Sequence, residues 1–315
     1  MLDKSETAMH ANVGALAALG TAFAWTLTAL AFEYAGKRIG AVALNFLRLA
    51  VGCLFLGLYC LIARGSFFPF DAPLSAWAWL GLSGLIGLVI GDLLLFQSFI
   101  DIGSRVAMLV YATAPAFTAV LGFLVFGERI SLLGIGGMCL TLAGIAMVVF
   151  GRRSGQTESP GAPVNRPHGV RGLVLAGGAT LGQAGGLILS KVGAGSGVGA
   201  MDPFAGTQIR VSAAVLGFAI ALIATRSWRG IGAALKDRKA IWSLSLGSFF
   251  GPFLGVSLSL LAVQSGDVGI ASAIMSIVPV LIIAPSALIL KERVALREIM
   301  GSVIAVAGVF ALFLA

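Results

Sequence analysis

Long apolar runs, separated by short connections that carry charge, proline or glycine, dominate the chain. Ten runs are long enough to cross a bilayer, which takes about 20 apolar residues per helix. They span approximately residues 12–34, 40–63, 74–99, 104–126, 131–150, 171–193, 203–225, 240–263, 268–290 and 296–315. The pattern therefore predicts an all-α integral membrane protein with ten transmembrane helices.

One long hydrophilic stretch lies between the fifth and sixth apolar runs. Residues 151–170 are rich in Gly, Pro, Ser and Arg, a composition that is typical of flexible linkers. This linker divides the chain into a first five-helix unit at residues 12–150 and a second at residues 171–315.

The second unit repeats the first at an offset of 164 residues. Pro115 aligns with Pro279, and a Glu-Arg pair follows thirteen residues later in both units. The same offset aligns Gly87 with Gly251, Gly91 with Gly255, Gly137 with Gly301 and Gly144 with Gly308. Because five is odd, a second copy must start from the opposite face of the membrane, so we expect two inverted five-helix repeats. Many secondary transporters use this architecture to expose one central site to either side in turn.

The composition narrows the class of protein. Of the 315 residues, 58% are hydrophobic and 11% charged, and the mean hydropathy is +1.01, which excludes a soluble enzyme, a disordered chain and a fibrous one. A net charge of +8 would suggest nucleic acid as a partner of a soluble protein. Here the cations lie in short connections between apolar runs, so we expect no nucleic-acid partner.

The polar N-terminal residues, with Asp3, Lys4 and Glu6, predict that no signal peptide is cleaved.

The distribution of basic residues predicts the orientation. Of the 21 Lys and Arg residues, fifteen lie in the odd-numbered loops and four in the N-terminus, the even-numbered loops or near their ends. The positive-inside rule places the odd-numbered loops in the cytoplasm. We therefore expect a multi-pass protein of the cell (inner) membrane with both termini on the non-cytoplasmic side.

Three charged residues lie well inside predicted spans rather than near their ends, where each charge costs about 2.5–3.5 kcal/mol to insert. Arg48 and Arg210 correspond between the repeats at an offset of 162, and inversion places them in opposite leaflets. Each either lines an aqueous path that attracts an anionic group or is paired structurally. Asp92 has Val256 as its counterpart, and is either an ion-pair partner of Arg48 or a proton-binding site.

Other residues in the spans are candidates for helix irregularities and for the lining of a pocket. Pro115 and Pro279 fall in mid-span, where each would kink its helix and free a carbonyl, either as a hinge or as a structural bend. Trp25 is central in its span, unlike most membrane tryptophans. Together with polar side chains of other spans it would line a pocket or pack structurally; these are Asn45, Gln97, Tyr111, Gln183 and Ser257.

No motif in the sequence indicates catalysis, nucleotide hydrolysis or metal binding. The three cysteines lie inside apolar runs without metal-ligand spacing, and the two histidines are far apart. We expect neither an enzyme nor a bound cofactor or metal.

At this level of detail the chain resembles the drug/metabolite transporter superfamily, and specifically its ten-helix EamA-type permeases. The resemblance covers nearly the whole chain. The two segments that carry it are PAFTAVLGFLVFGERISLLGIGGMCLTLAGIAMVV from Pro115, and PVLIIAPSALILKERVALREIMGSVIAVAGVFALF from Pro279. The resemblance implies alternating access of a cavity lined by the first four helices of each repeat, with the fifth and tenth helices peripheral. Asp92 breaks the repeat symmetry and has no role in the pattern.

The sequence therefore predicts a secondary transporter that exports a small organic solute such as an amino acid or related metabolite. The expected partners are this solute and membrane lipid, while a coupling proton and the oligomeric state stay open. The expected substrate-binding residues are Trp25, Asn45, Arg48, Asp92, Gln97, Tyr111, Gln183, Arg210 and Ser257. A nucleotide-sugar or phosphate-ester exchanger, which needs more cations in the cavity, and a non-transporting structural subunit remain alternatives.

Overall fold

The structure is a computed structural model that describes residues 4–102, 110–151, 169–197, 199–226, 228–281 and 296–314. Throughout these ranges the regular elements are helices, and no strand occurs. The first half contains α1 (Lys4–Ile39), α2 (Ala41–Arg64), α3 (Leu74–Ser83), η1 (Gly84–Gly91), α4 (Asp92–Ile102), α6 (Ala114–Phe126) and α7 (Leu132–Gly151). The second half contains α8 (Gly169–Ala194), α9 (Pro203–Ala224), α10 (Trp228–Ala234), α11 (Arg238–Ser248), η3 (Phe249–Gly255), α12 (Val256–Ser265), α13 (Val268–Met275), α14 (Val278–Leu281) and α16 (Leu296–Phe313).

These elements follow the order of the ten predicted spans. Six stretches of the described chain are long and apolar enough to cross a membrane, including the continuous third and eighth spans at Leu74–Leu95 and Arg238–Ser265. Three shorter apolar helices supply the fourth, fifth and tenth spans, and α13 with α14 begins the ninth. The prediction of an all-α membrane fold is confirmed.

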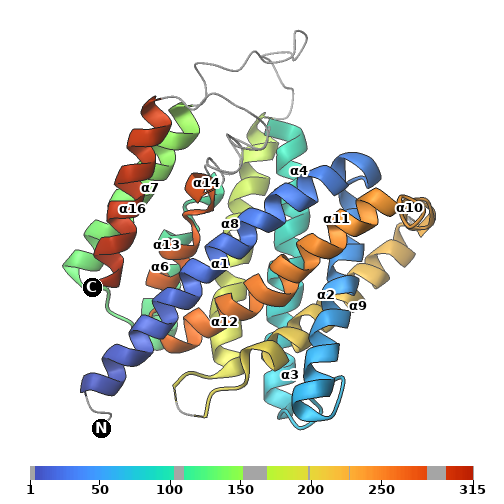
Figure 1. Cartoon of the computed structure of the whole chain (residues 1–315), viewed down its shortest axis with the longest axis horizontal. Coiled ribbons are helices and arrows are strands. Elements are labelled where there is room, and N and C mark those ends of the chain that lie inside the picture. Colours follow the sequence, from blue (N-terminus) through green and yellow to red (C-terminus); the bar gives the residue numbers. More distant parts are fainter. Residues whose placement is uncertain are drawn as a thin grey trace.

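The connections separate to two sides of the molecule, as Figure 1 shows. The α1–α2 turn, α10 and the start of α16 lie on one side, while the start of α1 and the end of α16 lie on the other. The α2–α3, α8–α9 and α12–α13 connections share the side of the termini. An even number of crossings brings both chain ends to one side, as the ten-span pattern requires.

A local irregularity at equivalent places supports the repeat. The third span of each half changes from α-helix to a π-helical segment and back, at Gly84–Gly91 and at Phe249–Gly255. Both segments end at a glycine, and these two glycines are 164 residues apart in the sequence. π-helical turns are rare and mostly single insertions within α-helices. Their matched positions therefore indicate that the two halves share one three-dimensional plan.

Each half packs its third span against the first span of the other half. The continuous helix α3–η1–α4 lies along α8, and its counterpart α11–η3–α12 lies along α1. The two second spans, α2 and α9, pack directly against each other. This reciprocal pairing is what two inverted repeats produce when they interlock around a shared axis.

Glycines permit the closest of these contacts. A Cβ atom added to Gly182 of α8 would lie 3.0 Å from the Cα atom of Gly91, and one added to Gly186 would lie 3.2 Å from that of Gly87. At the equivalent seam, the backbone of Gly255 instead accommodates the Trp25 indole of α1. Small residues allow helix backbones to approach in lipid, where burial of apolar surface does not drive association.

The fifth and tenth spans form a pair at one edge of the molecule (Figure 1). A Cβ atom on Gly144 of α7 would approach the Gly301 carbonyl of α16 to 2.6 Å, so the two backbones are in close contact. Outward-facing side chains such as Leu132, Val303 and Phe310 are exposed, as lipid-facing residues should be. The expectation of peripheral fifth and tenth helices agrees with this arrangement.

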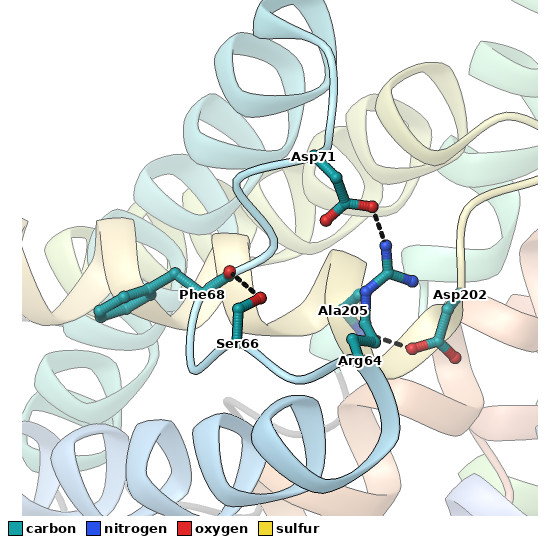
Figure 2. Close-up of polar contacts among 6 residues, drawn as sticks. All are labelled: Arg64, Ser66, Phe68, Asp71, Asp202 and Ala205. Carbon is teal, nitrogen blue, oxygen red and sulfur yellow. Dashed lines mark hydrogen bonds and ion pairs between the residues drawn. The ribbon is translucent and has the colours of Figure 1, made fainter.

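The loop after α2 folds against the start of α9, as Figure 2 shows. Arg64 and Asp71 form an ion pair across the loop, and the Ser66 hydroxyl donates to the Phe68 carbonyl at 2.8 Å. Asp202 accepts the Ala205 N–H at 3.0 Å and so caps α9. The link between the two segments is the Gln208 amide of α9, which donates to the Phe67 carbonyl of the loop at 3.4 Å.

Each of the two mid-span prolines closely follows a break in its span. Pro115 lies in the first turn of α6, after a helical turn that ends at Thr113. Pro279 lies likewise at the start of α14, after α13 has ended. Proline is favoured in a first helical turn because its missing N–H leaves no intrahelical bond unmade there. The fourth and ninth spans are therefore interrupted helices rather than bent ones.

Hydroxyl groups satisfy the backbone at the first of these interruptions. The Val110 carbonyl accepts from the Thr113 hydroxyl at 2.6 Å and from the Thr180 hydroxyl of α8 at 3.3 Å. Backbone groups released inside a membrane need such partners, since lipid provides none. The interruption is thus supported by the other repeat.

Candidate functional site

Arg48 forms the centre of a polar cluster in the first repeat. Its guanidinium donates to the Asn45 side-chain oxygen at 2.9 Å and forms an ion pair with Asp92 at the junction of η1 and α4. It also lies over the Phe32 ring, 5.7 Å from the ring centroid. The exposed fractions of the Arg48 and Asp92 side chains are 12% and 19%. Of the two alternatives for Asp92, the geometry shows the ion pair.

Tyr111 extends this cluster toward the interrupted fourth span. The charges of Asp92 and Arg48 both act on its phenol group, and the side chain is half-buried. Hydrogen bonding and the ion pair thus bring three of the expected residues, Asn45, Arg48 and Asp92, together from two spans.

Arg210 occupies the corresponding position of the second repeat in a different environment. It is the eighth residue of α9, as Arg48 is of α2, and its exposed fraction is only 4%. Its backbone lies against Gly84, and a Cβ atom on Gly87 would be 4.0 Å from its Nη2 atom. Its buried Nε and Nη1 atoms have no hydrogen-bond partner among the described residues. A guanidinium held between α9 and η1 thus retains unused donors.

Further unused polar atoms surround this part of α9. The Thr207 hydroxyl and the Gln208 side-chain oxygen on α9 and the Ser257 hydroxyl on α12 are buried without a partner in the described ranges. Helices α9 and α12 pack against each other. Polar atoms are costly to bury without partners. A polar ligand bound in the interior beside α9 would supply hydrogen bonds to these atoms and so stabilise the protein there.

The two arginines lie at different depths along the paired helices α2 and α9. Helices α2 and α9 run in opposite directions and touch where the Cys53 sulfur lies 3.6 Å from the Ser212 hydroxyl. At about 1.5 Å per residue, Arg48 and Arg210 are each about 10 Å from the start of their helices and are about 10 Å apart in depth. A solute passing between them would meet one cation after the other.

The remaining expected residues lie elsewhere. Trp25 packs on Gly255 at the α1–η3 seam. Gln183 is half-buried on α8. Gln97 donates to Asp101 at 2.9 Å, one turn further along α4.

Asp101 was missed by the sequence-based reasoning because α4 continues past the predicted end of the third span to Ile102. Its buried side chain faces Arg171 of α8, with Nε and Oδ2 3.5 Å apart. At that distance the two groups interact as charges, and Oδ2 has no hydrogen bond within the described chain. The four-residue spacing of Gln97 and Asp101 was the one signal that could have found the pair.

The second missed contact links the Glu-Arg motif of the first repeat to the second repeat. Glu128 Oε1 lies 2.6 Å from Lys191 Nζ of α8, and both side chains are about nine-tenths buried. Lys191 also donates to the Gly266 carbonyl at 2.6 Å, and Glu128 accepts the Val268 N–H at 2.9 Å. This ionic contact fastens the turn after α6 to the connection between α12 and α13.

Two hollows of the surface lie away from all of these residues. One of about 420 Å³ and one of about 540 Å³ adjoin the α1–α11 end of the molecule. Neither is lined by Arg48, Arg210 or another expected substrate-binding residue.

The comparisons with known proteins agree with the fold. A crystal structure described only as that of a protein is similar over 95% of both chains, with a TM-score of 0.71 and 17% sequence identity. At that identity the likeness shows the fold alone. No curated protein sequence matches the chain. The sequence model of the EamA-like transporter family, however, matches residues 12–150 and 170–314. With both halves matched, the chain belongs to the EamA-like transporter family and is a drug/metabolite-type transporter of small molecules.

Proposed function

We propose that the protein is a secondary transporter for a small organic solute with an anionic group, such as an amino acid or a related metabolite, which it exports by alternating access. Arg210 binds the anionic group in one half of the pathway. In the other half, Arg48 attracts the same group, while its partner Asp92 and the neighbouring Asn45 and Tyr111 line the pathway beside it. Trp25, Gln97, Gln183 and Ser257 contribute to the walls of the pathway, and the interruptions at Pro115 and Pro279 let the fourth and ninth spans move.

The two buried nitrogens of Arg210 that have no hydrogen-bond partner in the described part of the chain support this proposal most directly. A buried cation without a partner is costly, and a carboxylate would supply two acceptors that match the geometry of a guanidinium. Arg48, the counterpart of Arg210, already has such a partner in Asp92. The repeats thus differ in charge: one arginine is internally neutralised and the other is available to a ligand.

The ion pair of Arg48 and Asp92 suggests how the solute is released. A carboxylate that reaches Arg48 competes with Asp92 for the same guanidinium. Competition by a resident carboxylate weakens binding at the second arginine, and conduction requires that a solute leaves as well as enters. A proton on Asp92 would shift that competition toward the solute, which keeps proton coupling open.

A reconstituted-vesicle screen tests the proposal. The purified protein is placed in vesicles and uptake is measured for pools of amino acids and other metabolites, with and without a proton gradient. We expect flux of solutes that carry a carboxylate. Because a hydrogen bond to a charged group contributes about 1.5–3 kcal/mol, Arg210→Gln should raise the half-saturation concentration by about 10- to 150-fold.

Two controls make this result interpretable. Arg210→Lys keeps the charge and should retain part of the affinity, whereas Arg64→Gln removes a cation at the exposed end of α2 and should leave uptake unchanged. Flux limited to uncharged solutes, or an unchanged half-saturation concentration in Arg210→Gln, would refute the assignment of Arg210. Preferred flux of nucleotide sugars or phosphate esters, or no flux at all, would favour the two alternative functions.

We further propose that the protein lies in the inner membrane with both termini outside the cytoplasm. The basic excess on the side of α10 and the odd-numbered loops supports this orientation. A C-terminal fusion to alkaline phosphatase should be active in intact cells, and a fusion to green fluorescent protein should be dark. The opposite pattern would reverse the orientation.

A further inference from the structure

A groove between α1 and α11 combines a cationic mouth with an apolar wall. Its mouth is the hollow of about 540 Å³ beside Arg38, Lys236, Asp237, Arg238 and Lys239. The adjoining hollow of about 420 Å³ shares Arg238 and Lys239 with it and continues along apolar side chains of both helices. The two hollows therefore form one surface that changes from charged to apolar along its length.

The helical register of α11 produces this change. Arg238, Trp242 and Leu246 follow one another at intervals of four residues and so lie on one face, while Ala240 and Leu244 point into the core. The exposed fractions of Trp242 and Leu246 are 76% and 50%. From Arg238 to Leu246 the face is about 12 Å long, enough to follow a substantial part of an acyl chain.

On the other side of the groove, α1 also places a basic residue at the charged end and an aromatic residue at the apolar end. Tyr34 is 47% exposed and lines the apolar hollow, and Arg38, one turn later on α1, lines the charged one. Because α1 ends and α11 begins on the same side of the molecule (Figure 1), both helices place their cation toward the membrane surface and their aromatic ring deeper.

The charges at the mouth are not balanced by protein. Asp237 is the carboxylate that lines it, and both of its oxygens are engaged: Oδ2 by Arg38 at 2.8 Å and Oδ1 by the Ala240 N–H at 3.0 Å. Lys236, Arg238 and Lys239 have no carboxylate partner in the described part of the chain. Three positive charges remain for a ligand.

The inverted repeat provides an internal comparison. At the offset of 164, the counterparts of Lys236, Arg238 and Lys239 are Ala72, Leu74 and Ser75. The architecture itself therefore does not require cations at this position of the third span. Of these two equivalent positions, the one at the α1–α11 end carries the cations.

We propose that this groove binds one anionic phospholipid, with its phosphate at Lys236, Arg238 and Lys239 and one acyl chain along Trp242 and Leu246. A headgroup phosphate complements the three unbalanced charges, and basic clusters next to membrane helices attract anionic lipid. Tryptophan and tyrosine prefer the headgroup level, which places the rings of Tyr34 and Trp242 where the chain begins. The site is independent of the transported solute.

Lipid titration of the full-length protein in detergent micelles, followed by native mass spectrometry, tests the site. The probes are dioleoyl phosphatidylglycerol, dioleoyl phosphatidylcholine and inorganic phosphate. We expect one retained phosphatidylglycerol, weaker binding of phosphatidylcholine and no displacement by excess phosphate. The triple variant K236Q/R238Q/K239Q should bind phosphatidylglycerol on the order of 10- to 100-fold more weakly, and Trp242→Ala several-fold more weakly.

A control variant that removes the same number of cations elsewhere distinguishes a specific lipid site from general electrostatic attraction of the protein for anionic lipid. R152Q/R153Q/R166Q removes three cations from the linker and should leave phosphatidylglycerol affinity unchanged. Lys236, Arg238 and Lys239 are exposed, so the triple variant K236Q/R238Q/K239Q should elute and unfold like the unaltered protein. Equal losses in both triple variants, equal binding of the two lipids, or displacement by phosphate would each overturn the proposal.

Discussion

Replacing Lys191 by methionine would test the buried ionic contact that joins the two repeats. The change leaves the Glu128 carboxylate, about nine-tenths buried, with the Val268 N–H as its remaining donor. Removing one partner of a buried ion pair costs about 3–5 kcal/mol, mainly because the other charge stays desolvated. The Gly266 carbonyl loses its donor as well. At about 2 °C per kcal/mol for a chain of this size, the unfolding temperature should fall by roughly 6–10 °C.

The double variant Lys191→Met/Glu128→Gln shows whether this reasoning is right. Because both charges are then absent and an amide oxygen still faces Val268, the unfolding temperature should recover most of the loss. Unfolding is followed in detergent by tryptophan fluorescence. Arg64→Gln, which removes the exposed ion pair with Asp71 shown in Figure 2, should change stability by less than about 1 kcal/mol. Strictly additive effects of the Lys191 and Glu128 substitutions would refute the account of a coupled buried pair.

Two further predictions concern carboxylates. Asp92→Asn removes the charge partner of Arg48 and should destabilise the protein by about 1.5–3 kcal/mol while transport keeps its dependence on external pH; intact transport without that dependence would instead make Asp92 the proton site. In the turn before α11, the Ala240 N–H and the Arg38 guanidinium hold the pKa of the Asp237 carboxyl below its usual value of 3.8. Since this pKa is lower in the folded state, the group stabilises the fold above about pH 4, and the contribution is lost as the pH falls through the folded value. Asp237→Asn should therefore lower the unfolding temperature at pH 7 and flatten its decline in acid; an unchanged pH profile of unfolding would contradict this.

The membrane-spanning pattern was predictable because the bilayer imposes it on every segment. Lipid offers no hydrogen-bond partners, so each span must be helical and apolar, and hydropathy reports this directly. The repeat followed from the shared spacing of Pro115 and Pro279 to their Glu-Arg pairs. The same prolines predicted an irregularity in the fourth and ninth spans but not its form, since proline both bends helices and begins them.

The candidate site was less predictable, because it depends on which spans meet. Arg48 and Asp92 carried a visible signal as charges inside apolar runs. Asp101 did not, because it lies beyond the predicted end of the third span and its partner Arg171 belongs to the other repeat. Arg48 has a carboxylate partner, whereas Nε and Nη1 of Arg210 have no hydrogen-bond partner among the described residues; this contrast depends on packing that the sequence does not show.

The reciprocal pairing of third and first spans has a consequence for biosynthesis. When the ribosome has delivered the first five helices, the glycine-lined face of α3–η1–α4 still lacks α8, which follows only after the linker. This face must remain in contact with lipid or with the insertion machinery until the sixth helix emerges. The nascent chain therefore cannot finish the first half before starting the second, and a chain truncated at the linker would be a substrate for membrane quality control.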